Sequence, residues 1–314
     1  MTQCHFDTAW FCGAYNDSRI YIKVNGRRSE LWKEVIIALE LSAGAAVALG
    51  FSRFAYALLL PPMREDLGWS YVEAGALNTA NGAGYIVGAL VTAWIARKWG
   101  TARVFLAGFS VSVLILLLTA TATRFSTLFV LRIVGGASTA LTFILGAGLA
   151  AAICPMQSPR RRGTLVGLYV AGASIGILLA GAAIPIILQG GVQRWPEGWV
   201  ALGLIGAAAL PAAWGAARNV PEPVGRSIAV LDISEFRQLA PTFVGYSLFG
   251  AGYVGYMTFI IALLQKQGSS NGQVTLFWFV LGLARISQTI ISDVMIGGQS
   301  KMVARVDAAK RERA

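Results

Sequence analysis

The sequence predicts an all-α protein, a bundle of helices that crosses a membrane several times. Hydrophobic residues fill 56% of the 314 positions and charged residues only 13%, against about 25% charged residues in soluble proteins. Eight apolar stretches are long enough to cross a bilayer as helices, which takes about 20 residues each. Lys and Arg also alternate in number from one connecting segment to the next. Together these observations exclude an ordinary soluble enzyme.

The eight predicted spans occupy most of the chain. Residues 1–34 lack the apolar segment and cleavage site of a signal peptide, so we expect a poorly ordered tail there. Pro61 and Pro62 are expected to end the first span at its outer end, while Ser70 and Glu73 have the spacing of a capping box that starts the second. The spans are predicted at residues 35–61, 71–95, 104–123, 127–153, 164–188, 199–217, 239–264 and 274–295.

The basic residues predict the orientation of these spans. Of the 26 Lys and Arg residues, 19 fall in segments on one side of the membrane and four on the other. The remaining three, Arg53, Arg132 and Arg285, lie within spans. Cytoplasmic segments of membrane proteins carry the excess of Lys and Arg, so both termini are predicted to be cytoplasmic.

Several side chains are expected at the membrane surface. The clusters Arg97, Lys98, Arg103 and Arg160–Arg162 are predicted to anchor the bundle at lipid headgroups, which makes membrane lipid an expected partner. No nucleic-acid partner is expected, since the basic residues are not gathered on one solvated face. Tyr71, Trp195 and Trp199 are placed where interfacial aromatic residues usually lie.

The spacing of the spans suggests two halves. The longest internal connection, residues 218–238, separates a six-span half at 35–217 from a two-span part at 239–295, and a basic tail follows at 296–314. The seventh span repeats the first at an offset of 202 residues. Matching pairs are Gly50-Phe51 with Gly252-Tyr253, Phe54 with Tyr256, and Leu58-Leu59 with Ile260-Ile261. Such a repeat is typical of parallel halves in a transporter.

Enzyme chemistry is not expected. Three scattered cysteines and the single His5 offer neither a disulfide framework nor a metal site, and no cofactor motif is present. Gly172-Ala-Ser174-Ile-Gly176 fits the nucleophile-elbow pattern, but no base lies in its span, so no catalytic residue is assigned. These glycines, like Gly84 and Gly88, are expected to let helices pack closely.

Polar residues inside the spans are the strongest functional signal, because a charge at the bilayer centre costs about 3 kcal/mol or more. At about 1.5 Å of helix rise per residue, Arg53 lies roughly 12 Å and Arg132 roughly 9 Å inside the outer boundary. Asn78 and Asn81 fall near the same depth, so these four residues predict one polar layer. Alternatively, the arginines extend outward or satisfy helix-end carbonyls. Glu40, near the inner end of the first span, is a candidate for proton coupling.

The chain resembles the YbfB/YjiJ group of the major facilitator superfamily. The resemblance rests on Gly50-Phe51-Ser52-Arg53-Phe54-Ala55-Tyr56 with Leu58-Leu59-Leu60-Pro61-Pro62-Met63, on Leu131-Arg132 with Gly136 and Ala140, and on residues 253–260. It implies two six-helix halves, alternating access and a bacterial inner-membrane location. It also implies that the first, fourth and seventh helices line a central cavity. We therefore expect substrate-binding residues at Arg53, Tyr56, Asn78, Asn81, Arg132, Tyr253 and Tyr256.

The chain departs from that superfamily in two places. The loop at Arg97-Lys98-Trp99-Gly100-Thr101-Ala102-Arg103 keeps the glycine and basic charge but lacks the usual acid. After about Ala284 we find no further family pattern, and a chain truncated after eight of twelve helices is expected. The predicted function is secondary transport of a small molecule, with two arginines favouring a small organic anion. The alternative is a membrane sensor or assembly protein that does not transport.

Overall fold

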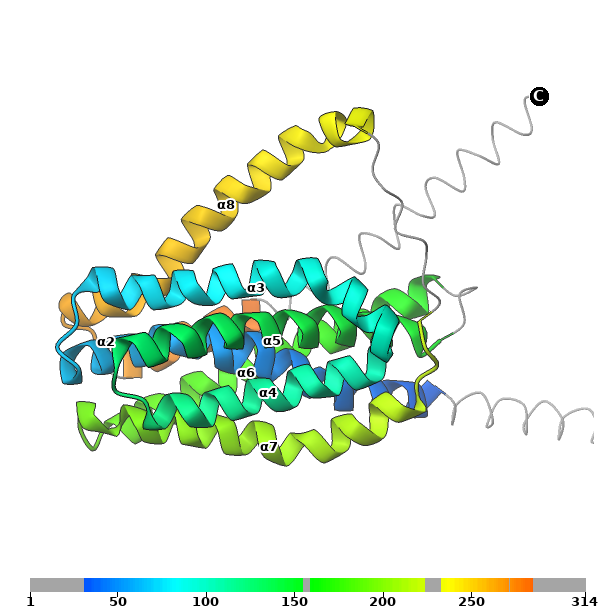
Figure 1. The fold of residues 1–314 in the computed structure, drawn as a ribbon. Helices are drawn as coiled ribbons and strands as arrows, with labels where there is room; N and C mark the ends of the chain where they lie inside the picture. Colours follow the sequence, from blue (N-terminus) through cyan, green and yellow to red (C-terminus); the bar gives the residue numbers. More distant parts are fainter. Residues whose placement is uncertain (1–30, 155–158, 224–232, 271, 285–314) are drawn as a thin grey trace, which may run out of the picture.

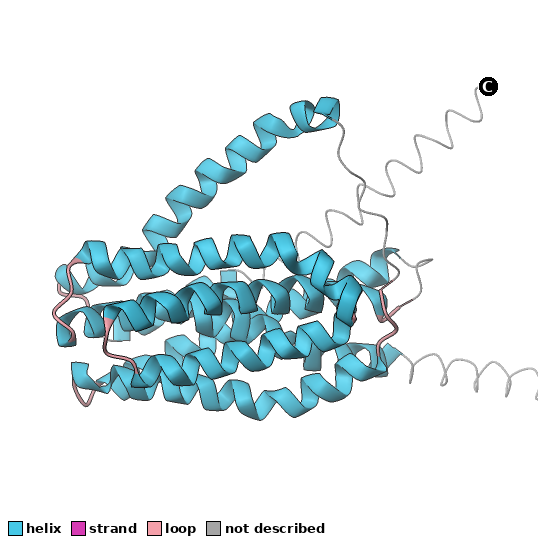
Figure 2. Ribbon diagram, viewed as in Figure 1, coloured by secondary structure: helices cyan, strands magenta, loops and turns pink. Residues whose placement is uncertain are grey.

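The structure is a computed structural model that describes residues 31–154, 159–223, 233–270 and 272–284. Within these ranges the chain is helical apart from short turns, and they contain no strand (Figure 2). The predicted all-α fold is therefore confirmed for the described part of the chain.

Six helices are long and apolar enough to cross a membrane. The first helix runs over Leu31–Asp66 and contains a π-helical stretch, η1 (Ala46–Phe54), which continues into α2 (Ala55–Asp66). The other five are α3 (Tyr71–Trp99), α4 (Thr101–Thr121), α5 (Phe125–Ala152), α6 (Pro159–Leu188) and α7 (Trp195–Asn219), the last preceded by the short 3-10 turn η2 (Val192–Arg194).

Two further apolar helices follow, and each is shorter than the six spans. One, Leu248–Leu264, forms the apolar part of α8 (Ile233–Lys266), and the other is Gly272–Ala284. The predicted tail and connecting loop are each shorter than expected, because residues 31–34 and 233–238 are helical. The predicted ends of the eighth span and the C-terminal tail lie outside the described residues.

Glycines let the six helices pack closely, as the sequence predicts. A Cβ on Gly84 of α3 would lie 2.0 Å from the carbonyl oxygen of Ile133 in α5. A Cβ on Gly172 of α6 would lie 2.1 Å from the carbonyl oxygen of Ser42 in the first helix. No side chain fits at these distances, so the two helix pairs are in backbone contact.

The start of the second span is also as predicted. The Ser70 hydroxyl accepts the Glu73 backbone N–H at 3.2 Å, and the Glu73 carboxylate accepts the Ser70 backbone N–H at 2.8 Å. This capping box satisfies two N–H groups that the first turn of α3 leaves free. A similar pair of hydrogen bonds joins Ser270 and Gln273 at the start of helix Gly272–Ala284. The turn before it contains Gly268, whose φ is positive.

Two sequence predictions about the bundle are wrong. Pro61 and Pro62 do not end the first helix, which continues to Asp66 because the residues around them, including the buried Met63, pack into the core. Trp195 and Trp199 are not interfacial, since only 1% and 0% of their surfaces are exposed. Their rings fill the core of the six-helix bundle, and each indole N–H has a partner: the Asp66 carboxylate at 2.8 Å for Trp195, and the Met63 sulfur at 3.4 Å for Trp199.

The two ends of the bundle differ. At the basic end, α3 ends and α4 begins next to Arg97, Lys98 and Arg103; at the opposite end, the first helix turns into α3 near Tyr71. Figure 1 shows α8 running obliquely, with its first turns standing away from α3 and its last turns reaching the opposite end of the bundle. Thus α8 contacts the six helices over only part of its length.

Candidate functional site

The π-helical stretch η1 creates the geometry of the candidate site. In a π-helix the backbone bonds span five residues, and the N–H of Ala55 accordingly donates to the Gly50 carbonyl. Where the backbone hydrogen bonds return to the four-residue spacing of α2, one carbonyl of that turn is left without an N–H donor from its own helix. Such a turn needs a hydrogen-bond donor from outside its own helix.

Arg132 of α5 supplies a donor to this turn. Its Nη1 donates to the carbonyl oxygen of Ser52 at 3.0 Å, and only 5% of the residue is exposed. The guanidinium carbon lies 4.2 Å from the centre of the Tyr56 ring and 4.6 Å from that of Trp199. This geometry is a cation–π contact on two rings, which stabilises a guanidinium out of water. Arg132 therefore binds a carbonyl in the middle of the first helix, whereas the alternative expected carbonyls at helix ends.

Asn81 belongs to the same layer. Its side-chain amide is buried and donates to the backbone carbonyl of Arg132 at 3.3 Å. The bond joins α3 to α5 where a Cβ on Gly136 would lie 2.0 Å from the Asn81 carbonyl oxygen. Asn81 thus fixes the backbone that carries Arg132. Both residues have structural partners, and the predicted role of each in binding substrate stays a prediction.

Arg53 lies in a different environment, although it is one residue from Ser52. Its side chain is half-buried, and its guanidinium carbon lies 5.9 Å from the centre of the Tyr85 ring. No hydrogen bond or ion pair joins Arg53 to any described residue. Of the two arginines within the described spans, Arg53 is the more accessible one. The Nε and Nη2 of Arg132 also lack a hydrogen-bond partner, but they are enclosed in the core.

A small cavity connects Arg53 to α8. Its volume is about 20 Å³, enough for about one water and far below the several hundred Å³ of a typical ligand pocket. The Asn78 side-chain amide donates to the Thr258 hydroxyl in a short hydrogen bond. The first helix, α3 and α8 all contribute to the lining, which consists of Arg53, Phe54, Tyr56, Ala57, Asn78, Tyr253, Val254, Met257 and Thr258.

Aromatic rings close the contact between the first helix and the C-terminal part. Phe54 meets both Tyr253 and Trp278 edge to face, each at 6.4 Å between ring centres. At the opposite end, Tyr71 and Phe259 meet at 6.1 Å. We call these contacts, together with the Asn78–Thr258 hydrogen bond, the seam. The seam holds α8 and helix Gly272–Ala284 against the bundle.

Four predicted site residues lie outside the cavity lining: Arg132 and Asn81, whose partners are given above, and Tyr256 and Glu40. Tyr256 is 55% exposed, because the helix turns its ring away from the surface that Tyr253 and Met257 present to Phe54 and Arg53. Glu40 is partly buried in the first helix, and no hydrogen bond or ion pair among the described residues joins it to either Arg53 or Arg132. The structure does bring together Arg53, Tyr56, Asn78 and Tyr253.

Three residues of this region were not among the predicted site residues. Trp199 was expected at the interface, although it completes the two-ring contact of Arg132. Thr258 is the counterpart of the predicted residue Tyr56 at the offset of 202 residues, and this match was a usable signal. Ser52 takes part through its backbone carbonyl, which side-chain patterns do not reveal.

The basic end is open between the halves. Val244, Leu248 and Phe249 of α8 are 58–69% exposed. A Cβ placed on Gly245, Gly250, Gly252 or Gly255 would find no atom within 4 Å. The first turns of α8 therefore leave open space at these glycines, while the seam is closed.

The fold and the seam define a class of protein: a multi-pass membrane protein with the helix arrangement of the major facilitator superfamily. A solved proton:xylose symporter of that superfamily has a TM-score of 0.63, with 12% identity over 84% of this chain and 69% of that one. A bacterial homologue of the human lysosomal transporter Spinster, solved inward-facing and unoccupied, has a TM-score of 0.61 and 19% identity over 80% of this chain and 59% of that one. At these identities the likeness shows the fold.

Residues 45–305 match the protein family described as "Uncharacterised MFS-type transporter YbfB", and the chain belongs to that family. The match continues past Ala284, so our expectation that the family pattern stops there is wrong. A chloramphenicol resistance protein of Streptomyces lividans is 43% identical over 63 residues, which are 20% of this chain and 16% of that protein. The chain is thus similar to only part of that relative's length.

Proposed function

We propose that the chain is a secondary transporter of the bacterial inner membrane that works by alternating access. The observation that carries the proposal is the contrast between the two ends: the seam closes one end, while α8 stands away from the bundle at the other. Two halves that meet at one end and separate at the other form a cavity with access from one side.

In this proposal the structure is an inward-open state. The basic end carries Arg97, Lys98 and Arg103, and cytoplasmic segments are the ones enriched in Lys and Arg. That places both termini in the cytoplasm and the seam toward the outside. Exchange of substrate then requires the seam to open while the basic end closes, and the interactions at both ends must be weak enough to break and re-form.

The proposed substrate is a small organic anion, and Arg53 is the proposed binding residue. Arg53 has no hydrogen-bond or ion-pair partner among the described residues, and no acidic residue lines the cavity beside it. A guanidinium presents a planar pair of donors that suits a carboxylate or phosphate. Tyr56, Asn78 and Tyr253 line the same cavity and would supply hydrogen bonds and ring surface.

Arg132 and Asn81 then have an indirect role. They hold the π-helical turn whose next residue is Arg53, so they position the binding residue. Tyr256 is proposed to contact substrate only when the halves close over it, since its ring is exposed now. Glu40 remains our proposed residue for proton coupling, because it is the one acidic residue near the inner part of the first helix's apolar segment.

The test is transport by the purified chain in liposomes, with a panel of organic anions and cations. Arg53→Lys should lower the rate for anions about tenfold or more, because the bidentate geometry is lost. Arg124→Lys is the matched control, since Arg124 is exposed at the start of α5 and lies outside the cavity. Equal anion transport by the parent, Arg53→Lys and Arg124→Lys proteins would refute the anion site. Absence of transport of every compound would favour the sensor or assembly alternative.

A further inference from the structure

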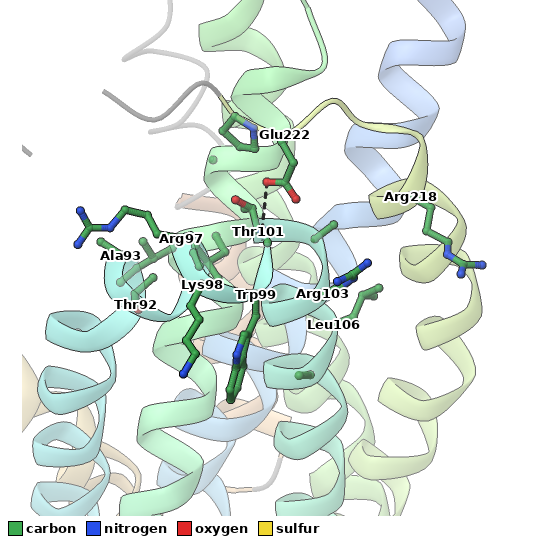
Figure 3. A pocket seen from close by; sticks show the side chains of 18 of the residues that line it. Thr92, Ala93, Arg97, Lys98, Trp99, Thr101, Arg103, Leu106, Arg218 and Glu222 are labelled. Atoms are coloured by element: carbon green, nitrogen blue, oxygen red, sulfur yellow. Dashed lines mark hydrogen bonds between the residues drawn. The ribbon is translucent and has the colours of Figure 1, made fainter. Parts of the chain in front are cut away.

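A second cavity lies at the basic end and is separate from the proposed transport site. Its volume is about 1280 Å³, and it surrounds the turn between α3 and α4 (Figure 3). Four cationic side chains line it, and the one acidic side chain in the lining is Glu222. The lining therefore carries an excess of three positive charges at neutral pH.

An anionic group already occupies part of this cavity. The Glu222 carboxylate accepts the backbone N–H of Thr101 at 3.1 Å, at the first turn of α4, and Figure 3 shows it above that turn. It comes from the segment after α7, 121 residues further along the chain. The sequence lacks an acid within the α3–α4 loop itself, so Glu222 supplies that charge from elsewhere in the fold. The position of the Glu222 carboxylate shows that a negatively charged group can bind at this turn.

Two of the cations remain available to a ligand. Lys98 lies 5.7 Å from the Trp94 ring, and Arg218 lies 5.4 Å from the Trp214 ring, so both are engaged with aromatic rings. Arg97 and Arg103 make no hydrogen bond or ion pair with any described residue. In Figure 3 they extend on different sides of the α3–α4 turn. Each is placed to attract an anionic group on its own side of the turn.

The inner part of the cavity is an apolar groove. Small residues of α3 and α4, including Ala93, Ala96 and Ala107, form its walls, and α5 forms its floor. Ile144 of the floor is 38% exposed, and a Cβ on Gly148 would find no atom within 4 Å. The groove is therefore open to an aliphatic chain. A soluble anion would use the basic mouth but gain nothing from this floor.

Exposed tryptophans place the mouth at the height of the lipid headgroups. Trp94 and Trp99 are each 60% exposed, and Trp214 is 46% exposed. Such rings concentrate where the hydrocarbon core meets the headgroups, and basic pockets between helices on the cytoplasmic side are suited to anionic lipid headgroups. Charge, apolar groove and aromatic rings together favour one occupant.

We propose that this cavity binds an anionic phospholipid of the cytoplasmic leaflet, with its phosphate at the α3–α4 turn in the positive field of Arg97 and Arg103 and one acyl chain in the groove. Glu222 competes with that phosphate for the same positive field. The site is independent of the transported substrate, since none of its residues lines the cavity at Arg53.

The experiment is native mass spectrometry of the full chain in detergent, titrated with phosphatidylglycerol and with phosphatidylcholine. The parent should bind phosphatidylglycerol at least tenfold more tightly. Replacing both Arg97 and Arg103 with Gln should weaken that binding roughly twentyfold, at about fivefold for each basic residue near the surface. Glu222→Gln should strengthen it about fivefold, because it removes a negative charge and keeps an acceptor for Thr101.

The matched control replaces Arg160 and Arg162 with Gln, which removes the same charge from the basic end outside this cavity. It should change binding less than threefold. Equal losses in the two double variants would show a diffuse surface-charge effect and overturn the site, as would equal binding of the two lipids. Glycerol phosphate, the soluble headgroup alone, should fail to displace the lipid at millimolar concentration; full displacement would overturn the role of the groove.

Discussion

The first helix and α8 share a sequence pattern at an offset of 202 residues, yet the structure packs them differently. Leu58 and Leu59 are buried, as are their counterparts Ile260 and Ile261, so the end of the repeat at the seam is alike in both. Toward the basic end the two diverge: a Cβ on Gly50 would lie 2.6 Å from the Cα of Gly176, whereas one on Gly252 meets nothing within 4 Å. The sequence pattern therefore determines which face of the helix can pack. Whether another helix packs against that face depends on the rest of the fold.

The divergence explains the two forms of helix. Five helices enclose the first helix, and Arg132 donates to the Ser52 carbonyl within its π-helical stretch. α8 is a regular α-helix over Ile233–Lys266. Inside a membrane, an irregular turn is stable only where another helix can hydrogen-bond to its backbone.

The largest expected effect comes from adding a methyl group at the matched glycines. Gly50→Ala should destabilise the protein by roughly 2–3 kcal/mol, because the methyl group meets backbone atoms of α6 that cannot move aside. Gly252→Ala should leave stability unchanged or raise it by up to about 1 kcal/mol, since alanine favours the helix and the space is open. Denaturant unfolding in detergent micelles, followed by tryptophan fluorescence, measures both. Equal effects at the two positions would contradict the packing difference.

The second prediction separates the two arginines. Arg132→Met should destabilise the protein by roughly 1–3 kcal/mol, because the Ser52 carbonyl loses its donor while a buried charge is also removed. Arg53→Met should change stability by less than about 0.5 kcal/mol, since Arg53 has no hydrogen-bond partner among the described residues. The same unfolding assay reads both variants. A larger loss for Arg53 would reverse the roles assigned to these residues.

The third prediction concerns helix caps, which are alike in the two parts of the chain. Ser70 with Glu73 and Ser270 with Gln273 cap α3 and helix Gly272–Ala284 in the same way. Ser70→Ala and Ser270→Ala should each destabilise their own helix by about 1 kcal/mol. Amide hydrogen exchange of the first turn of each helix should show the loss locally. If only one helix responds, the caps are not equivalent.

The smallest effect is expected at the seam. Asn78→Ala should remove a hydrogen bond to Thr258 that contributes about 0.6 kcal/mol in a membrane, and so favour opening about threefold. Labelling of a cysteine in place of the buried Ala57, with a membrane-impermeant maleimide, should become about threefold faster. The double variant Asn78→Ala with Thr258→Val should be labelled at nearly the same rate as Asn78→Ala alone. If the two substitutions instead increased the labelling rate independently, the Asn78–Thr258 hydrogen bond would not be what holds the seam closed.

Much of this fold could be predicted from sequence, because apolar length and charge alternation act along the chain. Six of the predicted spans correspond to long helices, and the Ser70–Glu73 cap depends on four consecutive residues. Pro61 and Trp199 were misjudged, since their surroundings come from distant helices. A proline ends a helix by local rules, but burial of the adjacent residues keeps the first helix continuous to Asp66.

The candidate site was predictable only as a set of residues. The depth of Arg53, Arg132, Asn78 and Asn81 follows from counting along helices, and the structure does join these residues by contacts in one region. Which arginine is engaged depends on the π-helical stretch, a backbone feature that side-chain patterns do not reveal. The carboxylate at the α3–α4 turn likewise comes from Glu222, 121 residues away, so no local motif could indicate it.

The most direct test of the account is disulfide cross-linking at the two ends of α8, in a chain whose native cysteines are replaced by serine. One pair, Gly75→Cys with Phe259→Cys, spans the seam, where a Cβ on Gly75 would lie 3.1 Å from the Cζ of the Phe259 ring. The other, Ala96→Cys with Gly245→Cys, spans the basic end. Without substrate, the seam pair should cross-link rapidly and the basic-end pair at least tenfold more slowly. Equal rates, or faster cross-linking at the basic end, would contradict a bundle that is closed at the seam and open at its basic end.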